Sequence, residues 1–437
     1  MHDDARRPVG ASAAAPIVFE APAGFARPAR APYAACLLVG LGGLFAGVTG
    51  PLLSAFVPPL VQNSLGDHRT AIGAVMAIDN VLLLLLVPLA GAASDRSLAR
   101  GRGRLPIVLS GLVLASAGMA FFPWSTTFGI TGLLAAMVVL YTGINVQRSP
   151  FHALVADLVP SPYRSLATGS VTFQMCAGAI VFLMLGRMLG MQLAFLTAAG
   201  TVLGIAAACV LGLREPQEST PLPAEETSFR ALFEAVWSAV LGRVPGLRAV
   251  FIASLLLQVT FQTFTTWFAL HSIERFGIAP EDVTIGFIAW ALGGVIGALP
   301  AGAVGVRIGR RNAMLLGFAS MAVCLLALDR VTDASGAVPI LALASASWAL
   351  PMVNAYPLFV EPIPRQQRGV LTAMFLLSIA LGGAIGDPFN GGIFDLLDGY
   401  RPMFLMMAGY AALAFVAVMV VPRGAGEART GPDSPRS

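Results

Sequence analysis

The fold of this chain is decided by residues 91–106, which read GAASDRSLARGRGRLP and lie between two long apolar runs, 71–93 and 106–122. Four arginines and one aspartate fall within residues 94–104, and each such charge costs about 2.5–3.5 kcal/mol at the centre of a bilayer. The segment therefore has to lie in water, as a short loop between two membrane-spanning helices. Because short cytoplasmic loops carry an excess of arginine, we expect this loop on the cytoplasmic side.

The composition of the whole chain agrees with a membrane protein. Of its 437 residues, 57% are hydrophobic and 11% are charged, whereas a soluble domain carries about 25% charged residues. Long uninterrupted apolar runs exclude a β-barrel, whose strands alternate over about ten residues. The basic residues sit in short loops between these runs, so they give no reason to expect nucleic-acid binding. We predict an all-α, polytopic membrane protein.

Apolar windows of about twenty residues predict twelve membrane-spanning helices. The longest polar interruption, residues 214–247, divides them six and six. The predicted helices lie near residues 34–61, 71–93, 106–122, 129–156, 166–187, 192–213, 248–270, 283–305, 313–328, 337–360, 370–391 and 402–422.

This pattern predicts two six-helix halves with short polar ends. Residues 33–213 form the first half and residues 248–422 the second, joined by a cytoplasmic linker over 214–247. Residues 1–32 are rich in Ala, Pro and Arg, which is typical of a disordered cytoplasmic tail rather than of a signal peptide. Residues 423–437 are predicted to form a second cytoplasmic tail.

The distribution of arginine supports this topology. With both termini inside, most of the 27 basic residues lie on the cytoplasmic side, as the positive-inside rule requires. The chain is therefore expected in the cytoplasmic membrane. The arginines placed in outer loops are Arg69, Arg187, Arg275, Arg330 and Arg401.

The two halves repeat a polar pattern. After the second helix of each half, a glycine is followed five residues on by an arginine: Gly91 by Arg96, and Gly302 by Arg307. After the fourth helix of each half, an acid is followed by Pro, Arg and Thr at matching intervals. Because both copies follow helices of the same direction, the repeat is parallel. The second pattern consists of Asp157, Pro160, Arg164 and Thr168 in one half, and Glu361, Pro364, Arg368 and Thr372 in the other.

These loops and acid–arginine pairs resemble the hallmarks of the major facilitator superfamily, over residues 33 to 422. Residues 91–106 and the stretch 145–158, which reads NVQRSPFHALVADL, resemble more closely the sucrose:proton symporters and related glycoside–cation symporters. The chain departs from plant sucrose carriers at His152, where those carriers usually have Arg, and at Asp79, which they lack. Melibiose-type symporters do place acids on their second helix, for the coupling cation.

Charged residues at the inner ends of the helices are candidates for a cytoplasmic gate. Acid–base pairs there can bridge neighbouring helices in one state of a carrier and separate in the other. The alternative is that the arginines only hold the loops inside, since surface ion pairs contribute about 0–1 kcal/mol. The predicted gate residues are Asp95, Arg96, Arg104, Asp157, Arg164, Arg307, Glu361 and Arg368.

The helix near 129–156 carries polar groups at membrane depth. Arg148 lies nine residues before Asp157, or about 13 Å along a helix, and Asn145 and His152 share its face. Polar groups at that depth usually serve a substrate or an ion. Here Arg148 and Asn145 would bind substrate and His152 would also titrate. The alternative is a structural ion pair that holds this helix to a neighbour.

Asp79 is the candidate for proton coupling, because burial disfavours a charged carboxylate and so suits it to bind and release a proton. It could instead pair permanently with Arg148, or cap a break in its helix together with Asn80.

The second half offers further candidate substrate ligands. Gln258 and Gln262 share a face of one helix and suit a sugar, but they also suit hydrogen bonds between helices. The segment from Asp387 to Asn390 resembles an unwound, cavity-facing stretch, or the extracellular end of its helix. Asn354 is a weaker candidate.

We therefore predict a secondary transporter in which two halves rock about a site at the middle of the membrane. The resemblance implies proton- or cation-coupled uptake of a sugar or glycoside, driven by a proton or sodium gradient without a bound cofactor, by a monomer. Its partners are the substrate, the coupling cation and the bilayer. The alternatives are a proton-driven efflux pump for small organic compounds and a non-transporting assembly factor or sensor. No phosphate-binding loop, enzyme signature or metal site is apparent.

Overall fold

A computed structural model describes residues 33–159, 163–213, 215, 246–360 and 368–422, and these residues form helices and no strand. The predicted tails, most of the predicted linker and the loop that holds Glu361 lie outside the described residues. The first half consists of α1 (Tyr33–Leu65), α2 (Arg69–Met76), α3 (Ile78–Ala99), α4 (Leu105–Ser125), the short 3-10 helix η1 (Thr126–Phe128), α5 (Gly129–Leu158) and α6 (Arg164–Gly212).

The second half repeats the same architecture after the polar interruption. Asp333 precedes one of its helices and accepts hydrogen bonds from the Ser335 hydroxyl and the Gly336 amide. These bonds hold the pKa of this exposed carboxyl below its usual value. The helices are α8 (Leu247–Phe276), α9 (Val283–Ile308), α10 (Arg310–Arg330), α11 (Ala334–Val360), α12 (Arg368–Leu396) and α13 (Met403–Met419).

The described helices confirm the predicted all-α membrane fold. Eight stretches among the described residues are long and apolar enough to cross a membrane, and α13 is a shorter apolar helix. Two of these stretches, Leu105–Val155 and Leu166–Gly212, each hold two of the predicted membrane-spanning helices. With α12 and α13, the described helices follow the twelve predicted ranges closely.

Two breaks interrupt the helices of the first half. The predicted helix near 71–93 is divided into α2 and α3, with Ala77 between them, which the sequence did not predict. In α6 the helix breaks at Gly190, whose φ is 75°, between the predicted helices near 166–187 and 192–213, as expected. A glycine takes this positive φ without the steric cost that another residue would meet.

Small residues bring the helices of each half close together. In the second half, a side chain at Gly293 or Gly297 would collide with the backbone of Ala342 and Ala346, because α9 and α11 touch there. In the first half, Gly43 of α1 lies in the same way against α6. Helices in lipid depend on such close approach, since burial from water does not drive their association.

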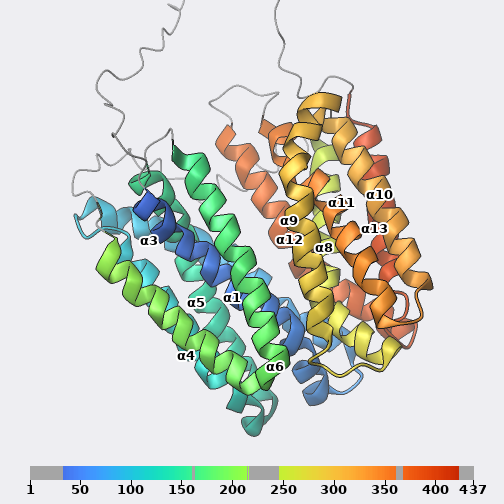
Figure 1. Cartoon of the computed structure of the whole chain (residues 1–437), viewed down its shortest axis with the longest axis horizontal. Helices are drawn as coiled ribbons and strands as arrows, with labels where there is room; N and C mark the ends of the chain where they lie inside the picture. The colour runs from blue at the N-terminus through green and yellow to red at the C-terminus, as the bar shows by residue number, and fades with distance from the viewer. Residues whose placement is uncertain (1–32, 160–162, 214, 216–245, 361–367, 423–437) are drawn as a thin grey trace, which may run out of the picture.

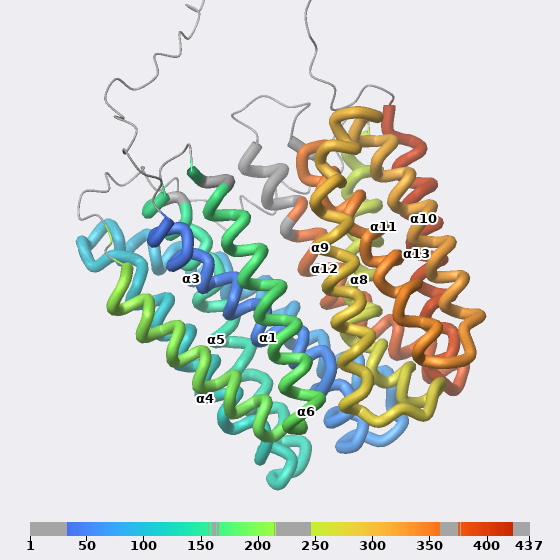
Figure 2. The backbone as a smooth tube through the Cα atoms, in the orientation of Figure 1, coloured from blue at the N-terminus to red at the C-terminus, as the bar shows by residue number. Residues whose placement is uncertain are grey.

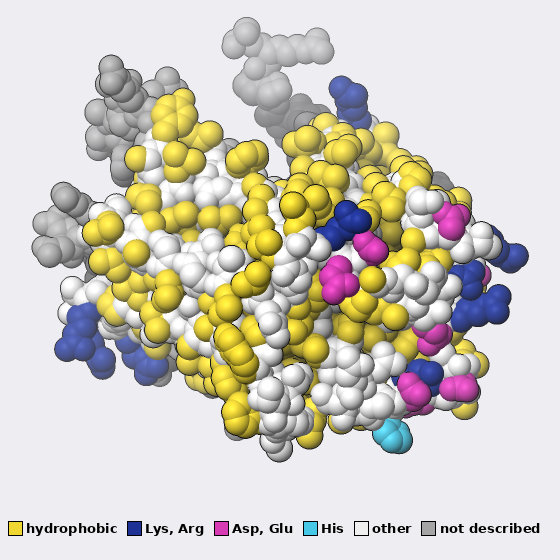
Figure 3. Space-filling view, turned by 60° about the horizontal axis from the view of Figure 1, so that its bottom comes forward, with side chains coloured by type: hydrophobic (Ala, Val, Ile, Leu, Met, Phe, Trp, Pro, Cys, Tyr) yellow, Lys and Arg dark blue, Asp and Glu magenta, His cyan; other side chains and the backbone are white. Residues whose placement is uncertain are grey.

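The two halves stand side by side (Figures 1 and 2). Helices α1, α4, α5 and α6 lie in one group and α8 to α13 in the other, while α2 packs against α12 of the second half. The space-filling view shows broad hydrophobic surface with small clusters of charge (Figure 3). We call the end that carries the 94–104 loop the Arg104 end, and the opposite end the Arg69 end.

Candidate functional site

A buried polar pair lies in the first half, just after the interruption at Ala77. Asp79 stands in the first turn of α3 and does not cap the helix with its side chain. Its Oδ1 accepts a hydrogen bond of 2.9 Å from Nδ2 of Asn145 on α5. Asn145 is fully buried, and its Oδ1 has no hydrogen-bond partner among the described residues. Asp79 is partly buried. The predicted proton site and a predicted substrate ligand are therefore direct neighbours.

A matching acid–amide pair lies in the second half. Nε2 of Gln262 on α8 donates to Oδ2 of Asp387 on α12 at 3.0 Å and also contacts the Thr266 hydroxyl at 3.3 Å. Asp387 is 0% exposed, yet its Oδ1 has no hydrogen-bond partner among the described residues. The side chains of Thr266 and Trp267 on α8 also act on this carboxylate. Asp387 is therefore surrounded by polar groups of α8.

The two acid–amide pairs meet where the halves join. The charges of Asp79 and Asp387 act on each other and on Tyr141, and α3 contacts α12. Gly383 of α12 lies directly against the Asn80 side chain, leaving no room for a Cβ. The site is therefore shared, with one carboxylate from each half. We call Asp79, Asn145, Gln262 and Asp387 the central site.

Arg148 and His152 lie on α5 beyond Asn145, and both are exposed. The charge of Arg148 acts on Asp79 and on His152. Arg148 forms no ion pair within 4.0 Å among the described residues, so the predicted alternative of a permanent pair with Asp79 is not seen in this structure. An exposed guanidinium whose field reaches the central site remains available to a substrate.

The other predicted ligands serve contacts within the second half. Gln258 approaches the Met352 sulfur at 3.7 Å. Asn354 donates to the carbonyl oxygens of Ala301 and Leu350, which joins α11 to α9. Asn390 donates to the Thr263 hydroxyl at 2.8 Å and accepts from the Tyr410 hydroxyl at 2.6 Å. We therefore leave these three residues out of the central site.

One prediction about the second half is wrong. The sequence favours an unwound stretch or a helix end from Asp387 to Asn390, but α12 continues through this segment to Leu396. Pro388 is tolerated inside this helix, because neighbouring helices and side chains can satisfy the backbone groups that a proline frees.

A polar latch joins the halves at the Arg69 end, and sequence reasoning did not identify it. Both oxygens of Asp395, at the end of α12, accept hydrogen bonds of 2.8 Å from the backbone amides of Arg69 and Thr70, at the start of α2. The Thr70 hydroxyl also donates to Asp395. The Arg69 guanidinium reaches Asp398 at 3.2 Å and lies over the Tyr400 ring. We call these five residues the latch.

The backbones of α2 and α12 touch directly beneath the latch. A Cβ at Gly391 would collide with the Arg69 carbonyl, and one at Gly73 would collide with the carbonyl of Asp387. Arg187 of α6 adds a second link at this end, an ion pair of 3.0 Å with Asp282 before α9. These contacts join the two halves at the Arg69 end. Their partners lie more than 90 residues apart in sequence, so no local pattern reveals them.

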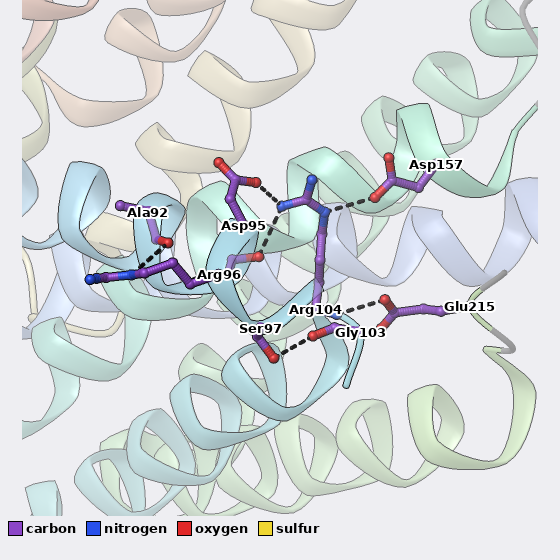
Figure 4. Close-up of polar contacts among 9 residues, drawn as sticks. Ala92, Asp95, Arg96, Ser97, Gly103, Arg104, Asp157 and Glu215 are labelled. Carbon is purple, nitrogen blue, oxygen red and sulfur yellow. Dashed lines mark hydrogen bonds and ion pairs between the residues drawn. The ribbon is translucent and has the colours of Figure 1, made fainter. Parts of the chain in front are cut away.

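Arg104 organises the opposite end of the first half (Figure 4). Its guanidinium lies between Asp95 of α3 and Asp157 of α5, at 2.7 Å from Asp157, and contacts the Ser94 hydroxyl. These bonds raise the pKa of Arg104 above its ordinary value, although burial opposes that shift. The cluster ties together helix ends within one half.

Glu215 completes this cluster, and the sequence analysis missed it. Its carboxylate accepts hydrogen bonds of 2.6 Å from the backbone amides of Arg104 and Leu105 at the start of α4. Glu215 stands three residues after the end of α6. An acidic residue so close to the end of a half's last helix was the sequence feature that could have identified it.

The remaining predicted gate residues do not join the Arg104 cluster. Arg96 points away from Arg104 and donates to the Ala92 carbonyl of its own helix (Figure 4). Arg307 is exposed. Glu361 lies outside the described residues, as do the side chains of Arg164 and Arg368. The gate over the whole Arg104 end therefore stays a prediction.

The Arg104 cluster leads to a prediction about stability. Arg104→Ala is expected to lower the free energy of unfolding by about 1–3 kcal/mol, because it leaves Asp95 and Asp157 close together without their partner. The matched control Arg96→Ala removes the same charge from the same region. It should change the free energy of unfolding by less than about 0.5 kcal/mol. Thermal unfolding of the two purified variants measures this. Equal destabilisation would contradict the role given to Arg104.

Comparison of the sequence with known proteins finds one family. The sequence pattern of the Major Facilitator Superfamily matches residues 37–386 and 250–436. Multidrug resistance protein 1 of Bacillus subtilis (strain 168) is 26% identical over 272 residues, which are 60% of this chain and 64% of that protein. The quinolone resistance protein NorA of Staphylococcus aureus (strain MSSA476) is 22% identical over 248 residues, 56% of this chain and 59% of that protein. Both matches span less than two thirds of the relative.

Solved structures share the fold over almost the whole chain. The nucleoside transporter NupG has a TM-score of 0.69 at 16% identity and aligns over 89% of this chain and 99% of its own. A D-xylose-proton symporter has a TM-score of 0.69 at 15% identity, over 90% of this chain and 99% of its own. At these identities the likeness concerns the fold alone.

Proposed function

This chain belongs to the major facilitator superfamily, and we propose that it couples the movement of a small organic solute to that of protons through Asp79 and Asp387. It is a transporter and not an enzyme, and it crosses the membrane several times. The coupling ion, the solute and the direction of transport are the parts that we propose.

The observation that carries the proposal is the pairing of two carboxylates across the junction of the halves. Each is held by one amide group, from Asn145 or Gln262, and each feels the charge of the other. Two like charges in a site removed from water are unfavourable, and one proton shared between them relieves the repulsion. Asp79 is partly exposed while Asp387 is sealed, so Asp79 is the carboxylate through which a proton would enter.

The proton site and the latch lie on the same two elements. Asp387 and Asp395 are eight residues apart on α12, about 12 Å along the helix, and α2 leads from the latch to Asp79 through Ala77. A change of charge at the central site therefore acts on the contact that must separate when the Arg69 end opens. Such a differential contact is what lets a ligand shift a two-state equilibrium.

We place the Arg104 end and both termini in the cytoplasm, because the arginine-rich loop lies there and short basic loops remain inside. In this orientation the latch closes the protein toward the outside of the cytoplasmic membrane. A proton or other cation gradient supplies the energy, and a single chain contains both carboxylates, so a monomer is sufficient.

We propose a sugar or glycoside as the solute. Nδ2 of Asn80 and Oδ1 of Asn145 have no hydrogen-bond partner among the described residues, and a hydroxyl group can both donate and accept. The exposed Arg148 adds further donors. This substrate class also follows the resemblance of residues 145–158 to the sucrose and glycoside carriers.

Export of organic compounds is the second candidate function. The curated relatives are resistance proteins, and a site with two carboxylates can also attract a cationic compound. On this alternative the same central site would exchange protons for the exported compound.

Transport by the purified protein in proteoliposomes distinguishes these two functions. With a panel of disaccharides and glycosides outside, sugar symport is expected to make the external medium more alkaline as protons enter with the sugar. If no compound of the panel changes the external pH, and an imposed pH gradient drives extrusion of a lipophilic cation, the sugar proposal is refuted and export is supported. If neither a pH change nor cation extrusion is observed, proton-coupled transport of either class is contradicted.

A further inference from the structure

A small cavity opens at the Arg104 end, between the end of α3 and the start of α4. Its volume is about 310 Å³. Arg96, which lines it, points away from the Arg104 guanidinium (Figure 4). The residues that line it are Ala93, Arg96, Ser97, Arg100, Arg102 and Ile107.

The charge of this cavity is positive and unbalanced. The three lining arginines are exposed, and none of them forms an ion pair within 4.0 Å of an acid in the described part of the chain. The neighbouring acids are already engaged: Asp95 and Asp157 bind Arg104, and Glu215 accepts from two backbone amides. The guanidinium groups of Arg100 and Arg102 are therefore free to bind an anion from outside the protein, as are the two terminal nitrogens of Arg96, whose Nε donates to the Ala92 carbonyl.

The backbone under these arginines is fixed before any ligand arrives. The Ser97 hydroxyl donates to the Gly103 carbonyl at 2.6 Å, and the Arg102 amide donates to the Ser97 carbonyl at 3.1 Å. Gly101 and Gly103 have φ values of 70° and 71°, which other residues rarely adopt. A loop held in this way does not have to be ordered on binding, which favours affinity.

We propose that this cavity is a binding site for a phosphate group. Arginine presents a planar array of donors that matches phosphate oxygens in pairs, and the apolar walls of Ala93 and Ile107 suit the carbon next to a phosphate ester. The cavity lies between the end of α3 and the start of α4, where we expect these apolar helices to leave the hydrophobic part of the membrane and meet lipid headgroups. An anionic phospholipid and a soluble phosphate compound are the two sources of this group.

The proposal is tested by lipid binding to the full chain in nanodiscs of phosphatidylcholine that contain a small fraction of phosphatidylglycerol. Native mass spectrometry counts the retained phosphatidylglycerol. The double variant Arg100→Gln/Arg102→Gln is expected to reduce the affinity for phosphatidylglycerol on the order of tenfold. The control Arg330→Gln/Arg401→Gln removes the same charge from exposed sites at the Arg69 end and should bind phosphatidylglycerol as the unaltered protein does.

The source is identified by competition with inorganic phosphate and glycerol phosphate. If neither displaces the lipid at millimolar concentration, the site takes a lipid headgroup, whereas displacement that depends on Arg100 and Arg102 supports a soluble ligand in the same cavity. Equal losses in the two double variants would overturn the proposal, because the effect would then be that of net charge. The proposal would also be overturned if neither double variant lost affinity for phosphatidylglycerol. Unchanged thermal unfolding of both variants shows that they are folded.

Discussion

Oxidation of a Thr70→Cys/Gly392→Cys variant is expected to stop transport completely, and a reducing agent should restore it. A Cβ at position 392 would lie 3.7 Å from the Thr70 hydroxyl oxygen, which is within the reach of a disulfide. The bond would join α2 to α12 directly beside the latch and hold the Arg69 end closed. A carrier that cannot open this end cannot complete its cycle.

The experiment starts from a chain in which the four native cysteines, all free thiols, are replaced by serine or alanine. Transport by the oxidised double variant is compared with that of each single-cysteine variant, which cannot form the internal bond and should be insensitive to oxidation. Transport that continues after full cross-linking would show that the latch does not need to open.

The second large effect is expected at the central site. Asp79→Asn and Asp387→Asn should each reduce gradient-driven transport by a factor on the order of 100 or more, while each keeps the shape of the side chain. An amide cannot take up a proton in this range of pH, so the two halves would no longer be coupled to the gradient. Exchange of labelled for unlabelled solute, which needs no net proton movement, is expected to be retained.

Asp333→Asn provides the matched control. It also neutralises one acid, but that acid is exposed and only caps α11, a role that asparagine can fill. Its transport should equal that of the unaltered protein. Full gradient-driven accumulation by Asp79→Asn or Asp387→Asn would remove that carboxylate from the coupling mechanism.

The fold was predictable because membrane insertion imposes a simple physical requirement. Apolar length and the arginines of residues 94–104 decide which segments lie in lipid, and the helices of the structure follow the predicted ranges. The details that escaped prediction depend on backbone geometry. The continuity of α12 through Pro388 depends on neighbouring helices, and the location of the interruption at Ala77 has no residue that marks it.

The candidate site was predictable in part. Polar residues at membrane depth are costly, and for this reason Asp79, Asn145 and Asp387 can be identified as candidates from the amino-acid sequence alone. That Asp79 and Asp387 lie near each other could not be predicted, since they come from different halves. The latch was hidden for a related reason: Arg69 and Asp395 lie near water, where charged residues are common, and 326 residues separate them.

The central claim, that a proton at Asp79 and Asp387 couples the two halves, is tested most directly by proton flux in proteoliposomes when a transported solute is added without an imposed gradient. We expect the solute to drive proton movement through the unaltered protein, and no movement through Asp79→Asn or Asp387→Asn at the same protein content. Proton movement of full size through either variant, or solute movement by the unaltered protein with no protons, would contradict the claim.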